Sequence, residues 1–205
     1  RYLRVIVPGY DQAHHHGHHH DHGPHGSHRN GSDGRSYRQI VELLEAATLR
    51  EPVRERALSI FSSLADAEAK VHGVAVEDVH FHEVGAVDAI VDVTAAAAGL
   101  DRLGVNKVTA SPVALGEGRV DTAHGLLPLP APATLELLKG IPTVPGHVEW
   151  ETVTPTGAAI LRTIADDFGA MPAMTVDAIG LGAGNDRAGP MPNVLRAVLG
   201  HSNEN

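Results

Sequence analysis

The chain contains no cysteine among its 205 residues. This absence excludes a disulfide scaffold, a thiolate zinc site, an iron–sulfur cluster and a cysteine nucleophile. Aromatic residues make up only 3% of the sequence, so the core has to be built from Ala, Val, Leu and Ile. No apolar run approaches the roughly 20 residues that span a bilayer, and the first residues do not resemble a signal peptide. These absences favour a cytoplasmic protein without a membrane segment.

Basic residues are also in the minority. The 16 Lys and Arg residues stand against 25 Asp and Glu residues, which gives a formal net charge of −9. Non-specific nucleic-acid binding needs a basic face, so we expect no nucleic-acid partner. Hydrophobic residues reach 42% of the chain, and that share at this length suffices for a packed core.

Histidine, in contrast, is abundant: 15 residues, nine of which lie between His14 and His28. Residues 8–36 otherwise carry mainly Gly, Asp, Ser and Asn, which predicts a mobile loop. The run is interrupted and follows a predicted strand at Tyr2–Val7, both of which disfavour an affinity tag. Neutral imidazole binds Ni, Zn, Cu and Co. We therefore expect this segment to concentrate divalent metal through His14, His15, His16, His18, His19, His20 and His22.

Hydrophobic periodicity predicts helices in the first half of the chain and strands mixed with helices in the second. The expected helices are 36–47, 52–71, 86–103, 133–139 and 156–168. The expected strands are 107–115 and 119–123, joined as a hairpin through residues 116–118, then 148–153, 175–181 and 193–199. This order indicates an α+β fold, with α/β as the alternative. We expect residues 1–35 to hold the strand and the histidine-rich loop, 36–200 one α+β domain, and 201–205 a tail.

The densest group of ligand-type side chains runs from His80 to Asp92. His80 and His82 share one side of an extended segment, and Asp88 and Asp92 share one face of a helix. Two imidazoles and two carboxylates suit a borderline divalent ion, and Glu83 offers a further ligand, a base or a helix cap. The alternative is that the acidic residues only stabilise a helix dipole and that the histidines lie on an ordinary strand.

Weaker signals follow in the second half. Thr154, Thr156 and Gly157 stand at an expected helix start and form a candidate phosphate or carboxylate site, unless the threonines only cap the helix. His124 is a lone histidine at a strand end, a position that is more often structural. The glycine-rich residues 180–186 match neither a P-loop nor a dinucleotide fingerprint.

Five segments, taken together and in order, resemble a known family. They read VHFHEVGAVD at 79–88, AHGLLPLPAPATLELL at 123–138, VTPTGAA at 153–159, GLGAG at 180–184 and PNVLR at 192–196. With these motifs the chain resembles the LarC family of nickel insertion proteins over most of its length. Two parts of the family pattern have no counterpart here: an N-terminal Asp-Cys-Phe-Ser-Gly-x-Ser-Gly-Asp-Met motif and a C-terminal CTP domain. We therefore expect this chain to bind nickel without completing insertion alone.

The resemblance implies a nickel chelatase of the lyase type. Its substrate would be pyridinium-3,5-bisthiocarboxylic acid mononucleotide, which receives Ni²⁺ between two sulfur donors and a ring carbon to give the nickel-pincer cofactor. CTP with Mn²⁺ or Mg²⁺ would assist through the C-terminal domain, and lactate racemase or a related nickel-pincer-dependent enzyme would receive the product.

The resemblance does not assign site residues, so their roles are our hypotheses. His80, His82 and Glu83 are the candidate catalytic residues, and Asp88, Asp92 and His124 extend the metal ligands. Thr154, Thr156 and Gly157 would hold the phosphate of the substrate. Two other functions stay open: a histidine-rich nickel storage or buffering protein, and a divalent-metal-dependent hydrolase built on His80, His82 and Asp88. Ligand type alone does not rank Ni²⁺ above Zn²⁺ or Co²⁺, and a homo-oligomer is compatible with each function.

Overall fold

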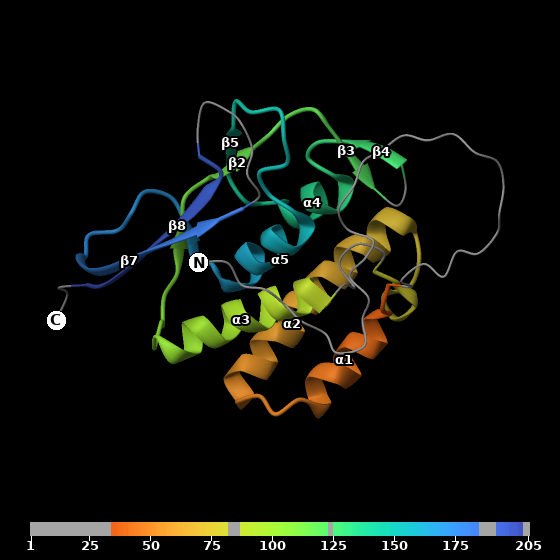
Figure 1. The fold of residues 1–205 in the computed structure, drawn as a ribbon, viewed down its shortest axis with the longest axis horizontal. Helices are drawn as coiled ribbons and strands as arrows, with labels where there is room; N and C mark the ends of the chain where they lie inside the picture. Colours follow the sequence, from red (N-terminus) through yellow and green to blue (C-terminus); the bar gives the residue numbers. More distant parts are fainter. Residues whose placement is uncertain (1–33, 82–86, 123–124, 185–191, 203–205) are drawn as a thin grey trace, which may run out of the picture.

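The computed structural model describes residues 34–81, 87–122, 125–184 and 192–202, whose arrangement Figure 1 shows. The helices are α1 (Tyr37–Ala46), α2 (Glu51–His72), the 3-10 helix η1 (Val76–Asp78), α3 (Val87–Arg102), α4 (Pro132–Leu137) and α5 (Pro155–Ile164). The strands are β1 (Thr109–Ala110), β2 (Val113–Leu115), β3 (Arg119–Thr122), β4 (Gly125–Pro128), β5 (Thr143–Pro145), β6 (Asp167–Phe168), β7 (Thr175–Ala183) and β8 (Val194–His201). Helices precede a mixed second half, which confirms the α+β fold. The predicted strand at 2–7 and the histidine-rich segment lie outside the described residues.

The long helix α2 forms the centre of the core. Its apolar residues recur with the helical period, and the buried ones are Val53, Ala57, Ile60, Phe61, Leu64, Ala65, Ala67 and Ala69. Helices α1, α3, α4 and α5 all pack against it, as Figure 1 shows. The helix ends where Gly73 adopts a left-handed conformation with φ of 66°. Neither α2 nor any other described helix is long and apolar enough to cross a membrane.

Two sequence-distant segments are joined at the start of α1. Ser36 caps this helix in a capping box with Gln39. The Tyr37 amide donates to the carbonyl of Val79 at 3.0 Å, and Ser36 forms an isolated antiparallel bridge with His80. This pairing fixes the segment that leads toward α3.

Every sheet among the described residues has two strands. β1 pairs with β6 and β2 with β5, both in parallel, whereas β3 pairs with β4 and β7 with β8 in antiparallel fashion. The expected single strand at 107–115 is therefore two short strands with different partners.

The expected hairpin between 107–115 and 119–123 is wrong. β3 pairs with β4 instead, with Val120 opposite Leu127. The backbone of residues 116–118, the turn of the expected hairpin, forms hydrogen bonds with other segments. The Glu117 amide donates to the Val148 carbonyl, and the Gly118 carbonyl accepts from the Leu129 amide. Those bonds direct residues 116–118 toward distant parts of the chain.

Two further predictions need correction. Residues 148–153 are not a strand, since β5 at Thr143–Pro145 takes the place beside β2. The helix expected at 156–168 ends at Ile164, because Asp167 and Phe168 form β6 beside β1. The remaining helices and the strands at 175–181 and 193–199 are confirmed within a few residues.

Candidate functional site

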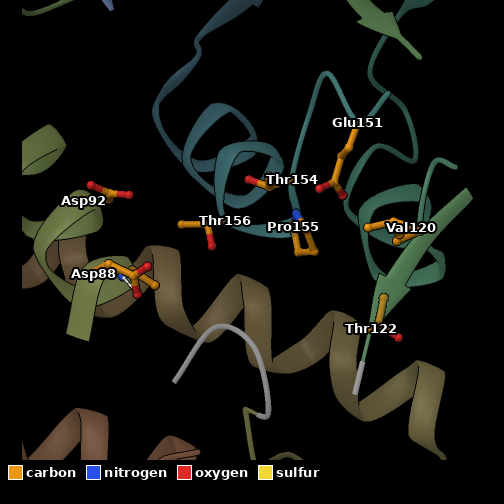
Figure 2. Close-up of a pocket in the computed structure, with 10 residues that line it drawn as sticks. Asp88, Asp92, Val120, Thr122, Glu151, Thr154, Pro155 and Thr156 are labelled. Carbon is orange, nitrogen blue, oxygen red and sulfur yellow. Dashed lines mark hydrogen bonds between the residues drawn. The ribbon is translucent and has the colours of Figure 1, made fainter. Parts of the chain in front are cut away.

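A cavity of about 250 Å³ lies between α3, the start of α5 and β3. Figure 2 shows the carboxylates of α3 on one side, the threonines of α5 in the middle, and β3 on the far side. The lining residues are Asp88, Ala89, Asp92, Val120, Thr122, Ala131, Glu151, Thr154, Pro155 and Thr156. The structure therefore brings together two groups of predicted site residues that are more than sixty positions apart in the sequence.

Helix α3 presents Asp88 and Asp92 to this cavity from successive turns. The orientation of the helix is fixed by Val93 and Ala97, which are fully buried on its other side. The backbone amide of Ala89 donates to a carboxylate oxygen of Asp88 at 2.9 Å. The predicted shared helical face of the two aspartates is thus confirmed.

Partial burial raises the pKa of Asp92 above its ordinary value, and the negative charge of Asp88 raises that pKa further. Both causes disfavour the ionised form of Asp92 when no cation is present. A bound divalent ion would remove the repulsion between the two carboxylates and bring the pKa down again.

The start of α5 contributes Thr154 and Thr156. Thr154 is the N-cap, and its hydroxyl oxygen accepts from the Gly157 amide at 3.2 Å. The capping interpretation is therefore confirmed for Thr154, whose side chain also lines the cavity. Ala158 and Ala159 are fully buried, so the core fixes the direction of the helix.

Glu151 is a cavity residue that sequence reasoning missed, together with Val120, Thr122 and Ala131. It lies in the irregular segment before α5, which the neighbouring Thr152 holds against β2. The Thr152 hydroxyl donates to the Ala114 carbonyl at 2.6 Å and accepts from the Gly116 amide at 2.8 Å. Glu151 stands three residues before Thr154, but no periodic pattern in the sequence marks it.

Among the described residues that line the cavity, the charged side chains are all acidic. Asp88, Asp92 and Glu151 line it, and no Lys, Arg or His is among its described lining residues. Such a wall favours a cation and repels a free anion. Within the described ranges, however, no three His, Asp or Glu side chains are arranged to hold a metal ion. The two aspartates of α3 and Glu151 line the cavity, but they do not form a metal-binding cluster among these residues.

Among the described residues, no predicted histidine joins the two aspartates at the cavity. His80 is exposed at its bridge with Ser36 and does not line the cavity. His82, Glu83 and His124 lie outside the described residues, as do His14, His15, His16, His18, His19, His20 and His22. In the sequence, Glu83 precedes Asp88 by five positions and His124 follows Thr122 by two.

The family model described as nickel insertion protein matches residues 2–205. A relative from Nocardioides, named pyridinium-3,5-bisthiocarboxylic acid mononucleotide nickel insertion protein, is 55% identical over 166 residues, which cover 81% of this chain and 42% of the relative. A Geobacillus kaustophilus relative with the same name is 48% identical over 166 residues, or 81% of this chain and 40% of the relative.

A Pelobacter propionicus relative, named putative nickel insertion protein, is 57% identical over 166 residues, again 81% of this chain and 42% of the relative. The matched region thus spans about two fifths of the length of these curated relatives. No solved structure matches the chain.

Proposed function

Because the chain belongs to the nickel insertion protein family, we propose that it acts in the insertion of Ni²⁺ into pyridinium-3,5-bisthiocarboxylic acid mononucleotide. The observation that carries this proposal is the family match over residues 2–205, joined by relatives whose names state that substrate. The product would be the nickel-pincer cofactor, and the activity that of a nickel chelatase. The acidic cavity between α3 and α5 supports the handling of a cation at the motif residues.

Nickel transfer at this site requires ligand exchange and no protein nucleophile. In the proposal Asp88 and Asp92 hold Ni²⁺ together with the imidazoles of His82 and His124, and Glu83 acts as a further ligand or base, whereas His80 does not line the cavity. Oxygen and nitrogen donors bind Ni²⁺ less tightly than the two sulfur atoms of the substrate. The absence of cysteine therefore suits a donor site that has to release its metal to sulfur.

The threonines of α5 are proposed to receive the phosphate of the substrate. A free phosphate would be repelled by Asp88, Asp92 and Glu151, so the metal has to arrive first and neutralise that wall. Thr154 and Thr156 then face the phosphate at the positive end of the helix. The phosphate would compete with the Thr154 hydroxyl for the Gly157 amide, which the cap already uses.

The remaining parts of the proposal follow the family resemblance. The histidine-rich segment, from His14 to His28, would collect Ni²⁺ in the cytoplasm and pass it to the cavity. CTP with Mn²⁺ or Mg²⁺ would act through a separate C-terminal domain, and a nickel-pincer-dependent enzyme would receive the product.

A deletion of residues 12–29 separates insertion from nickel storage. If the segment only stores metal, isothermal titration will show that almost all bound nickel disappears. Insertion predicts that one tighter site survives the deletion. In that deletion background, Asp92→Asn should weaken the surviving site by about tenfold, or 1.4 kcal/mol, whereas the exposed Asp66→Asn on α2 should not change it.

The activity itself is tested by mass spectrometry of the nucleotide product. Nickel-loaded protein is incubated with pyridinium-3,5-bisthiocarboxylic acid mononucleotide, with and without CTP and with the full-length Nocardioides relative as the positive control. A nickel-bound product, reduced by Asp92→Asn and by His82→Ala, supports the proposal. Nickel that stays on this chain while the relative forms product agrees with the expectation that this chain does not complete insertion alone. Loss of all nickel binding on deletion of residues 12–29 would contradict the proposal.

A further inference from the structure

The β7–β8 hairpin exposes apolar side chains on both of its faces. Ile179 and Leu181 lie on one face, 65% and 71% exposed, and Leu195 lies on the other, also 71% exposed. Among the described residues no other helix or strand packs closely against the hairpin, which stands at the left of the view in Figure 1. A two-stranded sheet is marginal by itself, and apolar side chains on both faces are typical of strands inside a larger sheet.

The two outer edges of this hairpin differ. β7 carries a bulge, because Val176 pairs with Gly200 and Ala178 with Leu199, which leaves Asp177 as an extra residue. Bulges interrupt the regular row of backbone groups and discourage further pairing. β8 runs regularly from Val194 to His201, without proline. In the described part of the chain no strand pairs with its outer edge, so that edge presents backbone donors and acceptors to a third strand.

The segment Tyr2–Val7 has the pattern that this edge requires. Leu3, Val5 and Val7 are every second residue, so in an extended chain their side chains share one side and give it an apolar face. The family model begins at residue 2, so this segment belongs to the same family unit as β8. Residues 8–33 connect it to the described chain, and these 26 residues reach roughly 85 Å when extended, which is ample for a domain of this size.

We propose that residues 2–7 dock as a third strand along the outer edge of β8. The backbone of the segment pairs with the free groups of β8, and Leu3, Val5 and Val7 continue an apolar face of the hairpin. The covalent connection raises the effective concentration of the segment to the millimolar range, which favours it over a second molecule. Docking would also hold the start of the histidine-rich segment on the folded body, a role that does not depend on the proposed nickel chemistry.

Amide exchange measured by NMR on the full chain tests the pairing. In an antiparallel hairpin, alternate amides of β8 point away from β7, and docking should protect them. The double substitution Val5→Pro with Ile6→Pro removes both donors and should speed exchange at these alternate β8 amides by at least about tenfold. The matched control, Val5→Thr with Ile6→Thr, keeps strand-forming residues and should retain protection. Amides of α2 report in every variant that the core is folded.

Cysteine trapping identifies the occupant, since the chain has no native cysteine. Val5→Cys is combined in turn with a cysteine at each position of β8, and with Leu103→Cys, a 60% exposed position just after α3, as control. Docking predicts an intrachain disulfide at neighbouring β8 positions that forms faster than the control disulfide. A disulfide-linked dimer, with protection that depends on concentration, would assign the edge to a second copy and overturn the proposal. Unprotected β8 amides and no preferred disulfide position would overturn it as well.

Discussion

The helical core and the β7–β8 hairpin use apolar residues in opposite ways. Helix α2 buries Ile60, Phe61 and Leu64 completely, and four other helices cover it. The hairpin leaves Ile179, Leu181 and Leu195 largely exposed. Both regions are rich in Val, Leu, Ile and Ala, so composition does not separate them. The difference lies in which neighbours the fold supplies to each region.

The largest effect should come from truncating one large apolar side chain in each of the two regions. Phe61→Ala removes a fully buried ring that packs against Phe81, and we expect a loss of about 3–5 kcal/mol in the free energy of unfolding. Ile179→Ala on the hairpin should cost less than about 1 kcal/mol. Urea denaturation followed by circular dichroism measures both. Similar losses at the two positions would show that the hairpin face is covered.

Gly116 beside β2 and Gly180 in the hairpin allow the same comparison between a closely packed and an exposed stretch of backbone. A Cβ on Gly116 would lie 1.8 Å from the carbonyl oxygen of Trp150, whereas a Cβ on Gly180 would meet nothing within 4 Å. Gly116→Ala should therefore destabilise the protein by about 1–3 kcal/mol and displace Glu151 from the cavity. Gly180→Ala should be close to neutral. Thermal unfolding gives the stabilities, and an unaffected Gly116→Ala protein would contradict the close packing of residues 150–152 on β2.

A smaller change in the free energy of unfolding is expected when Asp92 at the cavity is substituted. The raised pKa of Asp92 means that its contribution to stability is fully present below the ordinary aspartate pKa and is lost as the pH rises through the raised value. Asp92→Asn removes a partly buried charge and its repulsion with Asp88, so without metal it should stabilise the protein at pH 7 by about 0.3 kcal/mol. The figure is small because solvent screens the side chain. The variant should bind nickel more weakly than the wild type.

Asp66→Asn on α2 is the control for both the stability and the nickel binding of Asp92→Asn. In the chain that lacks residues 12–29, nickel affinity should fall as the pH is lowered through the raised pKa of Asp92, because protons then compete with the metal. Titrations of metal-free and nickel-loaded protein across pH 4 to 7 measure this dependence. A stability that is lower for Asp92→Asn at pH 7 would contradict the assigned repulsion.

The smallest change in stability should come from the ion pairs that Glu136 forms with two lysines. Hydrogen bonds from Lys139 and then Lys70 lower the pKa of Glu136, and the Lys70 ammonium lies 3.1 Å from its carboxylate. The stabilising contribution is present above the ordinary glutamate pKa and is lost as the pH falls through the lowered value. Glu136→Gln should therefore be slightly less stable than the wild type at pH 7 and equal to it at low pH. Glu42→Gln on α1 is the control, and a pH-independent difference at position 136 would contradict the ion pairs.

Local patterns predicted the parts of the fold that depend on neighbouring residues. The period of Val53, Ala57 and Ile60 predicts α2, and Gly73 marks its end, because a helix is satisfied by bonds within one short segment. The spacing of Asp88 and Asp92 likewise predicts one shared face. These features need no information about distant residues, and the structure confirms them.

Strand pairing was predicted less well, for a physical reason. The sequence of residues 113–115 does not indicate whether β2 pairs with β5 or with the nearer β3, because either strand could form hydrogen bonds with the same backbone groups of β2. The choice follows from bonds such as that between Thr152 and Ala114, which join positions 38 residues apart. Glu151 could not be predicted as a cavity residue either, because only the packing of its segment on β2, which is distant in sequence, brings it to the cavity.

The sequence by itself determined the helices, the histidine-rich composition, the lack of cysteine in this chain and the family to which it belongs. Tertiary structure alone decided that α3 and the start of α5 face one cavity, that Glu151 joins them, and that β7 and β8 remain exposed. Periodicity and residue chemistry act over a few positions and can be read along the chain. Cavities and strand partners arise from contacts between distant segments, which only the complete fold selects.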